Sequence, residues 1–262
     1  MNAPCLPPPT FPVTAMTVIA RPFTASGPYM PTAGLVAAVI ECWGPGAGGG
    51  GAIAGTTFPA IGGGGGGSGG YSRTTVTAAM VRGGVIVTIG AGGAGGITGP
   101  AGEGGGDGGV TSFGAMCVAY GGIGGITGIN AVTSGYGGAG AQAGIGDIAW
   151  AGNAGQTGGY VLVAENVEVV GGMGGAAPLG GGVAEEAATL ANTNVSTVGG
   201  AGMSPGAGGG GASSANSAAT PAGGAGANGF CLVTEYVLAG SSDGGSCQPQ
   251  ARVACFPPEW GC

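Results

Sequence analysis

The side chains that most often carry acid–base or nucleophilic chemistry are missing from this chain. Histidine is absent and the four basic residues are all arginines, so lysine is absent as well. Ser-His-Asp and Cys-His pairs, a histidine base and a Schiff-base lysine therefore cannot be built. The glycine runs cannot form a P-loop either, because that motif requires Gly-Lys-Ser/Thr. We predict no catalytic residue and no cofactor, and we expect that the protein is not an enzyme.

Carboxylates are the remaining candidates for chemistry. Glu185 and Glu186 form the one adjacent acidic pair and could serve acid–base catalysis, while Glu103 and Asp107 could offer oxygen ligands to Ca²⁺. Solubilising charge on loops explains both pairs more simply. We therefore predict no metal site.

The seven cysteines allow two interpretations. None forms a CxxC pair, and the lack of histidine argues against a tetrahedral zinc site. Cys5 near the N-terminus and the three cysteines after residue 246 could form disulfides between termini or subunits once the protein leaves the reducing cell. Unpaired thiols are the alternative. Cys42 follows a strand pattern, and we expect it in the core.

Charge and hydropathy exclude several partners. Eleven acidic residues against four arginines give a net charge of −7, which leaves no basic patch for nucleic acid. Residues 1–20 lack the basic start of a signal peptide and are interrupted by proline. No apolar stretch of about 18 residues runs uninterrupted by glycine, so we expect no membrane insertion. We expect a soluble protein that is made in the cytoplasm without a signal peptide.

Several short segments have the composition of β-strands. Residues 35–43 (LVAAVIECW) are apolar on both faces except at Glu41, which predicts a strand buried on both sides. Further strands are predicted at residues 71–77, 84–90, 117–120, 160–163, 167–170 and 230–238. By contrast, the first twelve residues hold five of the seventeen prolines, which favours an extended arm.

Glycine blocks separate these strands and determine the expected fold. The chain has 70 glycines without the Gly-X-Y period of collagen, and it is 44% hydrophobic, which argues against disorder. Polyproline-II-like helices repeat every three residues and leave their backbone groups free, so glycine lets neighbouring helices pair through them. We predict a mostly irregular, all-β fold: a glycine-rich sandwich of packed polyglycine-II helices with a few short strands and little or no α-helix. Flexible linkers are the alternative.

A series of motifs runs in order between residues 23 and 238. They are Phe-Thr at 23–24, Gly-Pro-Tyr at 27–29, Glu-Cys-Trp-Gly at 41–44, six glycines at 62–67, Gly-Tyr-Ser-Arg at 70–73, Val-Thr-Ile-Gly-Ala-Gly-Gly at 87–93 and Gly-Phe-Cys-Leu-Val-Thr-Glu-Tyr at 229–236. This order resembles the glycine-rich domain of bacteriophage tail-fibre and adhesin proteins. We predict an N-terminal attachment arm (1–22), the sandwich domain (23–240) and a cysteine-containing C-terminal tail (241–262).

The resemblance implies a virion protein that is assembled in the host cytoplasm. Its arm would contact other virion proteins, and its end loops would bind a bacterial surface receptor, either protein or glycan. A homotrimer is expected because fibres are commonly three-fold. The short length and the cysteine-bearing tail leave a capsid decoration or fibre-shaft role open. A secreted glycine-rich structural or ice-binding protein is a further alternative, but we find no secretory signal, regular Gly-X-X repeat or flat repetitive face in the sequence.

Receptor binding would fall to side chains in loops, since a glycine scaffold supplies few. We expect end loops at residues 126–136, 147–153, 183–198 and 212–222. The predicted receptor-binding residues are Trp150 and Tyr136 as aromatic anchors, with Asn130, Glu185, Asn192 and Asn194 as polar partners. Alternatively, Trp150 only covers the apolar edge of the sandwich.

Overall fold

Strands with alternating apolar residues build two antiparallel sheets at one end of the molecule. The computed structural model describes residues 15–54, 60–97, 103–129, 134–163, 166–178, 188–190, 195–215 and 217–239. The larger sheet has the order β1 (Met16–Phe23), β15 (Phe230–Leu238), β3 (Leu35–Trp43), β5 (Tyr71–Thr77) and β9 (Ile148–Trp150). The smaller one has the order β2 (Gly27–Tyr29), β6 (Val85–Thr88), β7 (Val110–Phe113) and β8 (Cys117–Tyr120).

The conventional hydrophobic core lies between these two sheets. Ala38, Ile40 and Cys42 of β3 and every second residue of β15 point inward and are buried. Tyr29 and Phe113 meet them from the smaller sheet, with ring centroids 5.2 Å apart. The short helix α1 (Ala78–Val81) adds Val81 to this core. The outward-facing residues of β3 are only partly covered, so the predicted burial on both sides of this strand is wrong for the single chain.

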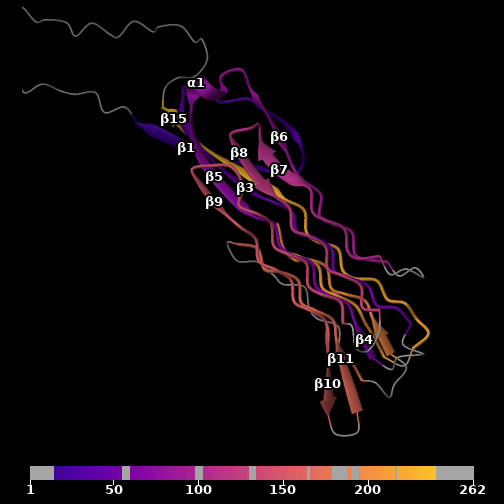
Figure 1. Ribbon diagram of the computed structural model, residues 1–262. Helices are drawn as coiled ribbons and strands as arrows, with labels where there is room; N and C mark the ends of the chain where they lie inside the picture. The colour runs from indigo at the N-terminus through magenta and orange to yellow at the C-terminus, as the bar shows by residue number, and fades with distance from the viewer. Residues whose placement is uncertain are drawn as a thin grey trace, which may run out of the picture.

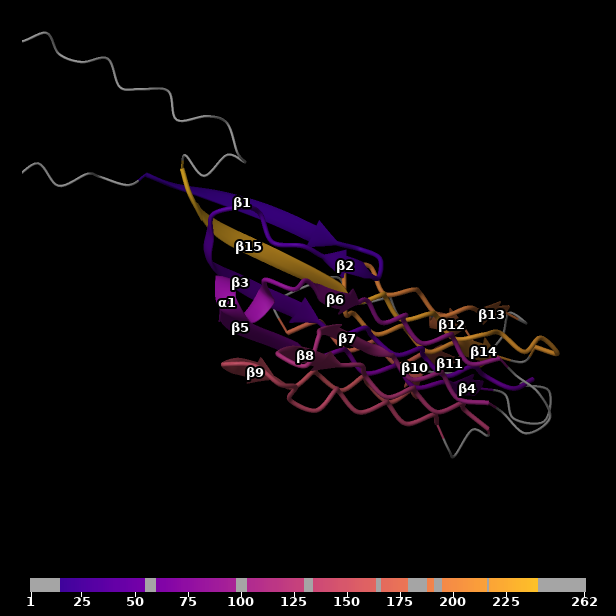
Figure 2. The same cartoon turned by 90° about the horizontal axis from the view of Figure 1, so that it is seen from above.

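Glycine-rich segments run from the sheets along the length of the body without forming strands (Figure 1; Figure 2). Residues 62–70 are bonded on all sides. Successive N–H groups donate to three different segments in turn: those of Gly63, Gly64 and Gly65 donate to the carbonyls of Ala212, Ile126 and Gln156. The next three N–H groups donate to the same three segments, in each case to the carbonyl three residues earlier. Their carbonyls accept from three more segments. The six neighbours are residues 44–50, 120–126, 135–141, 153–156, 172–175 and 206–212.

This arrangement is the hexagonal packing of polyglycine-II helices, in which each buried backbone group finds a partner in an adjacent chain. Residues 44–52 are surrounded in the same way, again by six segments. The inner segments are nearly pure glycine because a Cβ built on Gly64 or Gly65 would lie within 3.0 Å of a neighbouring carbonyl. The predicted fold class is therefore confirmed, and the linker alternative is wrong for these runs.

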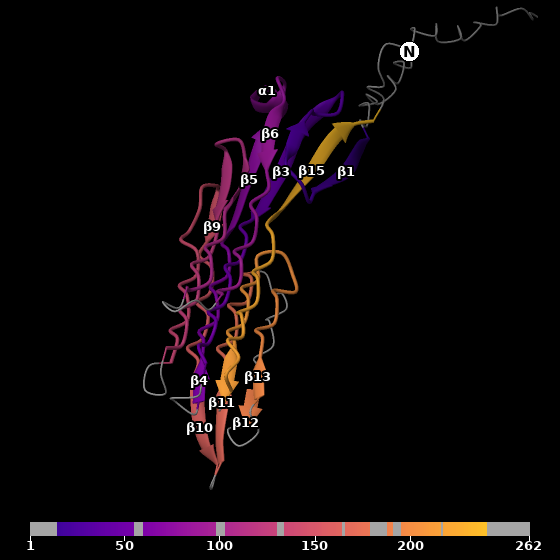
Figure 3. The same ribbon diagram turned by 90° about the vertical axis from the view of Figure 1, so that its right-hand side faces the viewer.

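Two small antiparallel sheets close the opposite end of the body (Figure 3). One contains β10 (Gly159–Val163), β11 (Asn166–Val170) and β12 (Ala188–Leu190). The other contains β13 (Val195–Thr197), β14 (Ser213–Ala215) and β4 (Ala60–Gly62). The β10–β11 hairpin extends furthest from the larger sheets (Figure 1).

The predicted strands at 35–43, 71–77, 117–120 and 230–238 are confirmed, with the bounds of β3, β5, β8 and β15. The predictions at 84–90, 160–163 and 167–170 correspond to β6, β10 and β11 with slightly different ends. β1 includes residues 16–22 of the segment that we predicted as an arm, and it pairs with β15 along its whole length. Residues 1–14 and the predicted tail at 241–262 lie outside the described residues.

Candidate functional site

Trp150 ends a row of aromatic side chains that crosses the larger sheet where it joins the glycine segments. The cross-strand pairs Phe230–Trp43, Trp43–Tyr71 and Tyr71–Trp150 place these rings on one face, with centroids 5.1 to 5.5 Å apart. Such aromatic neighbours stabilise a sheet beyond their buried area. Tyr71 is 4% exposed, whereas Trp150 is 47% exposed. Trp150 therefore covers the row and also presents one ring face outward.

A hydrogen bond fixes the centre of this row. The Tyr71 hydroxyl donates to Glu41 Oε1 over 2.7 Å. Burial, together with this bond to a carboxylate, raises the pKa of Tyr71 above its ordinary value, so the phenol stays protonated. The row is thus an uncharged, rigid surface. Trp150 itself lies in strand β9, so the predicted loop at 147–153 is wrong at its centre.

Tyr136 lies elsewhere, on the glycine body. Its carbonyl accepts from the Ile126 N–H over 2.9 Å, and its side chain is 62% exposed. Tyr136 lies beside Gly64, whereas Trp150 pairs with Tyr71. The extended segment from Gly64 to Tyr71 spans roughly 20 Å at about 3.1 Å per residue. The two predicted anchors therefore do not form one site. The predicted partners Asn130, Glu185, Asn192 and Asn194 lie outside the described residues.

Tyr136 instead lies beside a line of one tyrosine and three isoleucines, which we name the isoleucine ridge. The ridge consists of Tyr120, Ile123, Ile126 and Ile129, all between one third and just over one half exposed. These residues are three apart, which is one turn of a polyglycine-II helix, so their side chains point in one direction. The neighbouring segment runs antiparallel to the ridge and is bonded to it, because Ile123 and Ile126 donate to the carbonyls of Ala139 and Tyr136.

A shallow groove of about 310 Å³ lies between the ridge and this neighbour. Its side-chain lining comes from Tyr120 and Ile123 on one side and from Ala139, Ala141 and Gln142 on the other. A groove with an aromatic ring, apolar walls and one amide is suited to contact by an uncharged ligand or a protein surface. We missed the ridge in the sequence, although its signal is visible there as isoleucine at every third position from 123 to 129.

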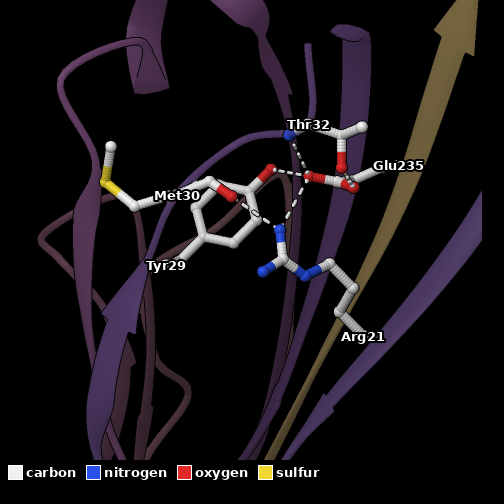
Figure 4. Close-up of polar contacts among 5 residues, drawn as sticks. All are labelled: Arg21, Tyr29, Met30, Thr32 and Glu235. Atoms are coloured by element: carbon white, nitrogen blue, oxygen red, sulfur yellow. Dashed lines mark hydrogen bonds and ion pairs between the residues drawn. The ribbon is translucent and has the colours of Figure 1, made fainter. Parts of the chain in front are cut away.

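A buried carboxylate joins the first and last strands near the chain ends (Figure 4). Glu235 accepts from the Tyr29 and Thr32 hydroxyls, each over 2.6 Å, and from the Thr32 N–H over 3.1 Å. Arg21 lies 3.3 Å away and also donates to the Met30 carbonyl. Burial alone raises the pKa of Glu235, but the bonds from Thr32 and Tyr29 and the Arg21 charge outweigh it and lower the pKa below its ordinary value.

This arrangement satisfies Glu235 completely and leaves it no exposure to solvent. It holds β1, β15 and the turn after β2 together and is inaccessible to a substrate. Its role is therefore structural. No sequence motif marks Glu235 for this role.

Three cysteines meet in the core between the sheets. Cys42, Cys117 and Cys231 are buried free thiols, and the sulfurs of Cys42 and Cys231 are 3.7 Å apart. Contact with the neighbouring cysteines, added to burial, raises the pKa of the Cys42 thiol, which makes it a poor nucleophile. The core position predicted for Cys42 is confirmed. The other four cysteines lie outside the described residues, so the proposed disulfides stay a prediction.

Of the two candidate calcium ligands, Asp107 bonds through its carboxylate and Glu103 through its main-chain carbonyl. Asp107 accepts from the Gly124 N–H over 2.8 Å, and the carbonyl of Glu103 accepts from the Thr127 hydroxyl. Over the described parts of the chain, no three potential metal ligands gather in one place. The same residues contain no helix with the length and apolar character that crossing a membrane requires.

A family model described as a glycine-rich domain matches residues 24–248, which is most of the chain. A search of curated proteins finds no match.

Proposed function

The chain belongs to the glycine-rich domain family, and from this premise we propose that it is a non-enzymatic structural component of a bacteriophage particle that attaches the particle to a bacterial surface. The order of motifs between residues 23 and 238, which resembles tail-fibre and adhesin proteins, is the reason for naming the particle. Under this proposal the protein contacts other virion proteins through its N-terminal segment and needs no cofactor.

The observation that carries the proposal is the polarity of the long body. The first and last described residues lie together at one end, where the Ala239 N–H donates to the Ala15 carbonyl over 2.8 Å. The glycine segments extend away from this end, side by side (Figure 3). A protein held at its termini would thus present the isoleucine ridge and the far-end hairpin outward. Rigid scaffolds that display exposed apolar and aromatic side chains are suited to recognition.

The ridge and Tyr136 are the best-placed contact surface among the described residues. Ile126 and Tyr136 are bonded neighbours and are 53% and 62% exposed. Both side chains lie outside the core and are open to contact by another molecule. Aromatic and aliphatic groups of this kind supply contact area at low entropic cost.

Adsorption and infection assays test the proposal. Purified full-length protein should bind cells of the strain on which the particle is propagated and should block infection. Replacing Ile126 and Tyr136 by serine should remove both effects. A matched control replaces Ile97 and Met203, which are also well exposed and lie outside the predicted end loops, by serine and should keep both effects.

Failure of well-folded protein to adsorb would contradict the attachment role and favour a capsid decoration or fibre-shaft protein. Adsorption that survives the Ile126 and Tyr136 replacements but is lost in the control pair would instead contradict the assignment of the surface. Circular dichroism and thermal unfolding verify that each variant is folded before it is scored.

One observation favours a second function, ice binding. The isoleucine ridge is a regular apolar line on a rigid face, and such repetition is what an ice-binding surface needs. Thermal hysteresis measured on the same protein separates the two functions. Activity that is lost on replacing Ile123 and Ile126 by serine would support ice binding, and no activity would eliminate it.

A further inference from the structure

Within the described part of the chain, one edge of strand β1 is unpaired, and the backbone of β1 defines which groups face outward. β1 is the terminal strand of its sheet and pairs only with β15 there. Ala15 accepts from Ala239, so the odd-numbered residues of β1 bond to β15. In an antiparallel pair, alternate residues face the partner and the others face away. The N–H and C=O groups of Met16, Val18 and Ala20 therefore point to the free edge.

From Met16 to Ala20 this edge carries no charge and no proline, two features that usually prevent strand pairing. Natural edge strands carry charges, especially lysine, or bulges that disfavour a second strand. The only charged residue of β1 is Arg21, and it turns inward to Glu235 and lies over the Tyr29 ring (Figure 4). Met16 and Val18 are apolar and are 51% and 58% exposed. Among the described residues β1 lies at the outside of its sheet, with this edge open (Figure 3).

Proline sets the extent of this edge. Pro22 occupies the next outward-facing position after Ala20, where it lacks an N–H group. The usable ladder is therefore limited to Met16, Val18 and Ala20, each of which offers one donor and one acceptor. This set is symmetric about Val18. A second copy of the same strand, turned by a two-fold axis, matches it donor for acceptor.

We propose that two copies of this protein pair through β1, antiparallel and with Val18 opposite Val18 of the second copy. Met16 then faces Ala20 of the other copy, and the two five-stranded sheets become one continuous sheet. The exposed side chains of Met16 and Val18 pack across the axis on the same face. The outer face of the sheet, including the partly covered residues of β3, continues across the junction. This proposal does not depend on the attachment function, and it replaces the homotrimer that the resemblance to fibre proteins implies.

Sedimentation velocity of the full-length protein under reducing conditions tests the pairing. We expect a dimer that dissociates on dilution between about 100 µM and about 1 µM. Val18→Pro removes one outward N–H and leaves the bonds to β15, and it should raise the dimer dissociation constant at least about tenfold. Ile86→Lys places a charge on an equally exposed residue of β6 and should change nothing.

Charge pairing tests the register and remains decisive if the proline variant fails to fold. Val18→Lys and Val18→Glu should each be monomeric because like charges would meet on the two-fold axis, whereas an equimolar mixture should form a heterodimer. Three results would overturn the proposal. They are a monomer at the highest concentration, a trimer, and a dimer that neither Val18→Lys nor Val18→Glu weakens.

Discussion

The two regions of the molecule bury themselves by different means. At the sheet end, side chains such as Tyr29, Ile40 and Phe113 fill the space between two sheets and are completely buried. In the glycine body, residues 62–70 are also buried, but their backbone groups do the packing. The first region gains stability from apolar burial. The second bonds its backbone groups to six neighbouring segments and tolerates almost no side chain.

The largest difference should appear when a side chain is added. Gly65→Val would place a Cβ within 3.0 Å of the Met173 carbonyl. The segment at 172–175 is itself hydrogen-bonded to residues 62–70, so it cannot move away without breaking those bonds. We expect a loss of more than about 5 kcal/mol in the free energy of unfolding, so that the protein fails to fold. Thermal unfolding followed by circular dichroism measures it.

Gly83→Ala is the matched control because a Cβ there has nothing within 4 Å. Its unfolding free energy should change by less than about 0.5 kcal/mol. Unchanged stability in Gly65→Val would contradict close packing of the glycine run, whatever the control does.

Removing a side chain should have the next largest effect, and only at the sheet end. Ile40 is fully buried in the core between the sheets. Ile40→Ala should cost about 3 kcal/mol from lost burial and the cavity left behind. Denaturant unfolding gives the value, and Ile40→Val should cost about 1 kcal/mol. If Ile40→Ala lowers the free energy of unfolding by less than about 1 kcal/mol, this core is loosely packed.

The Glu235 arrangement should make the sheet end sensitive to acid. The pKa of Glu235 is lower in the folded protein than its ordinary value of 4.5, so its contribution is present above that pH and is lost as pH falls through the folded pKa. Glu235→Gln should cost about 1–3 kcal/mol near neutral pH. The difference in unfolding temperature between the two proteins, measured from pH 7 downward, should shrink as the pH falls below 4.5. Parallel curves would contradict the assigned pKa direction.

The smallest effect is expected on the surface of the glycine body. The side chain of Ile126, a ridge residue, is exposed, while its backbone N–H donates to the Tyr136 carbonyl. Ile126→Ala should change the unfolding free energy by less than about 0.5 kcal/mol. Chemical denaturation measures this change. A larger loss would indicate that ridge side chains stabilise the body, and would weaken the comparison of the two regions.

Much of the fold could be predicted because local patterns determine it. β3, β5 and β15 are rich in β-branched and aromatic residues, and their bounds follow directly. β1 was missed because it follows a proline-rich stretch and gains its pairing from β15, over two hundred residues away. The three-residue strand β9 is too short for a periodic pattern.

The candidate site was harder to predict than the fold. Glycine segments pair through backbone groups that are the same in every segment. The sequence therefore did not reveal which segments are neighbours, or that Trp150 and Tyr136 are far apart. The isoleucine ridge was readable, but only with the three-residue period of the polyglycine-II helix. Periods of 2.0 and 3.6 residues, which identify strands and α-helices, do not detect it.

Amide hydrogen exchange in the native protein tests most directly whether backbone bonds hold the glycine body together. The amides of Gly63 to Gly67 donate to five different carbonyls in three other segments and lie outside any helix or strand. We predict that they exchange as slowly as the buried amides of β3, through global unfolding. Exchange near the rate of an unstructured glycine chain would contradict the account.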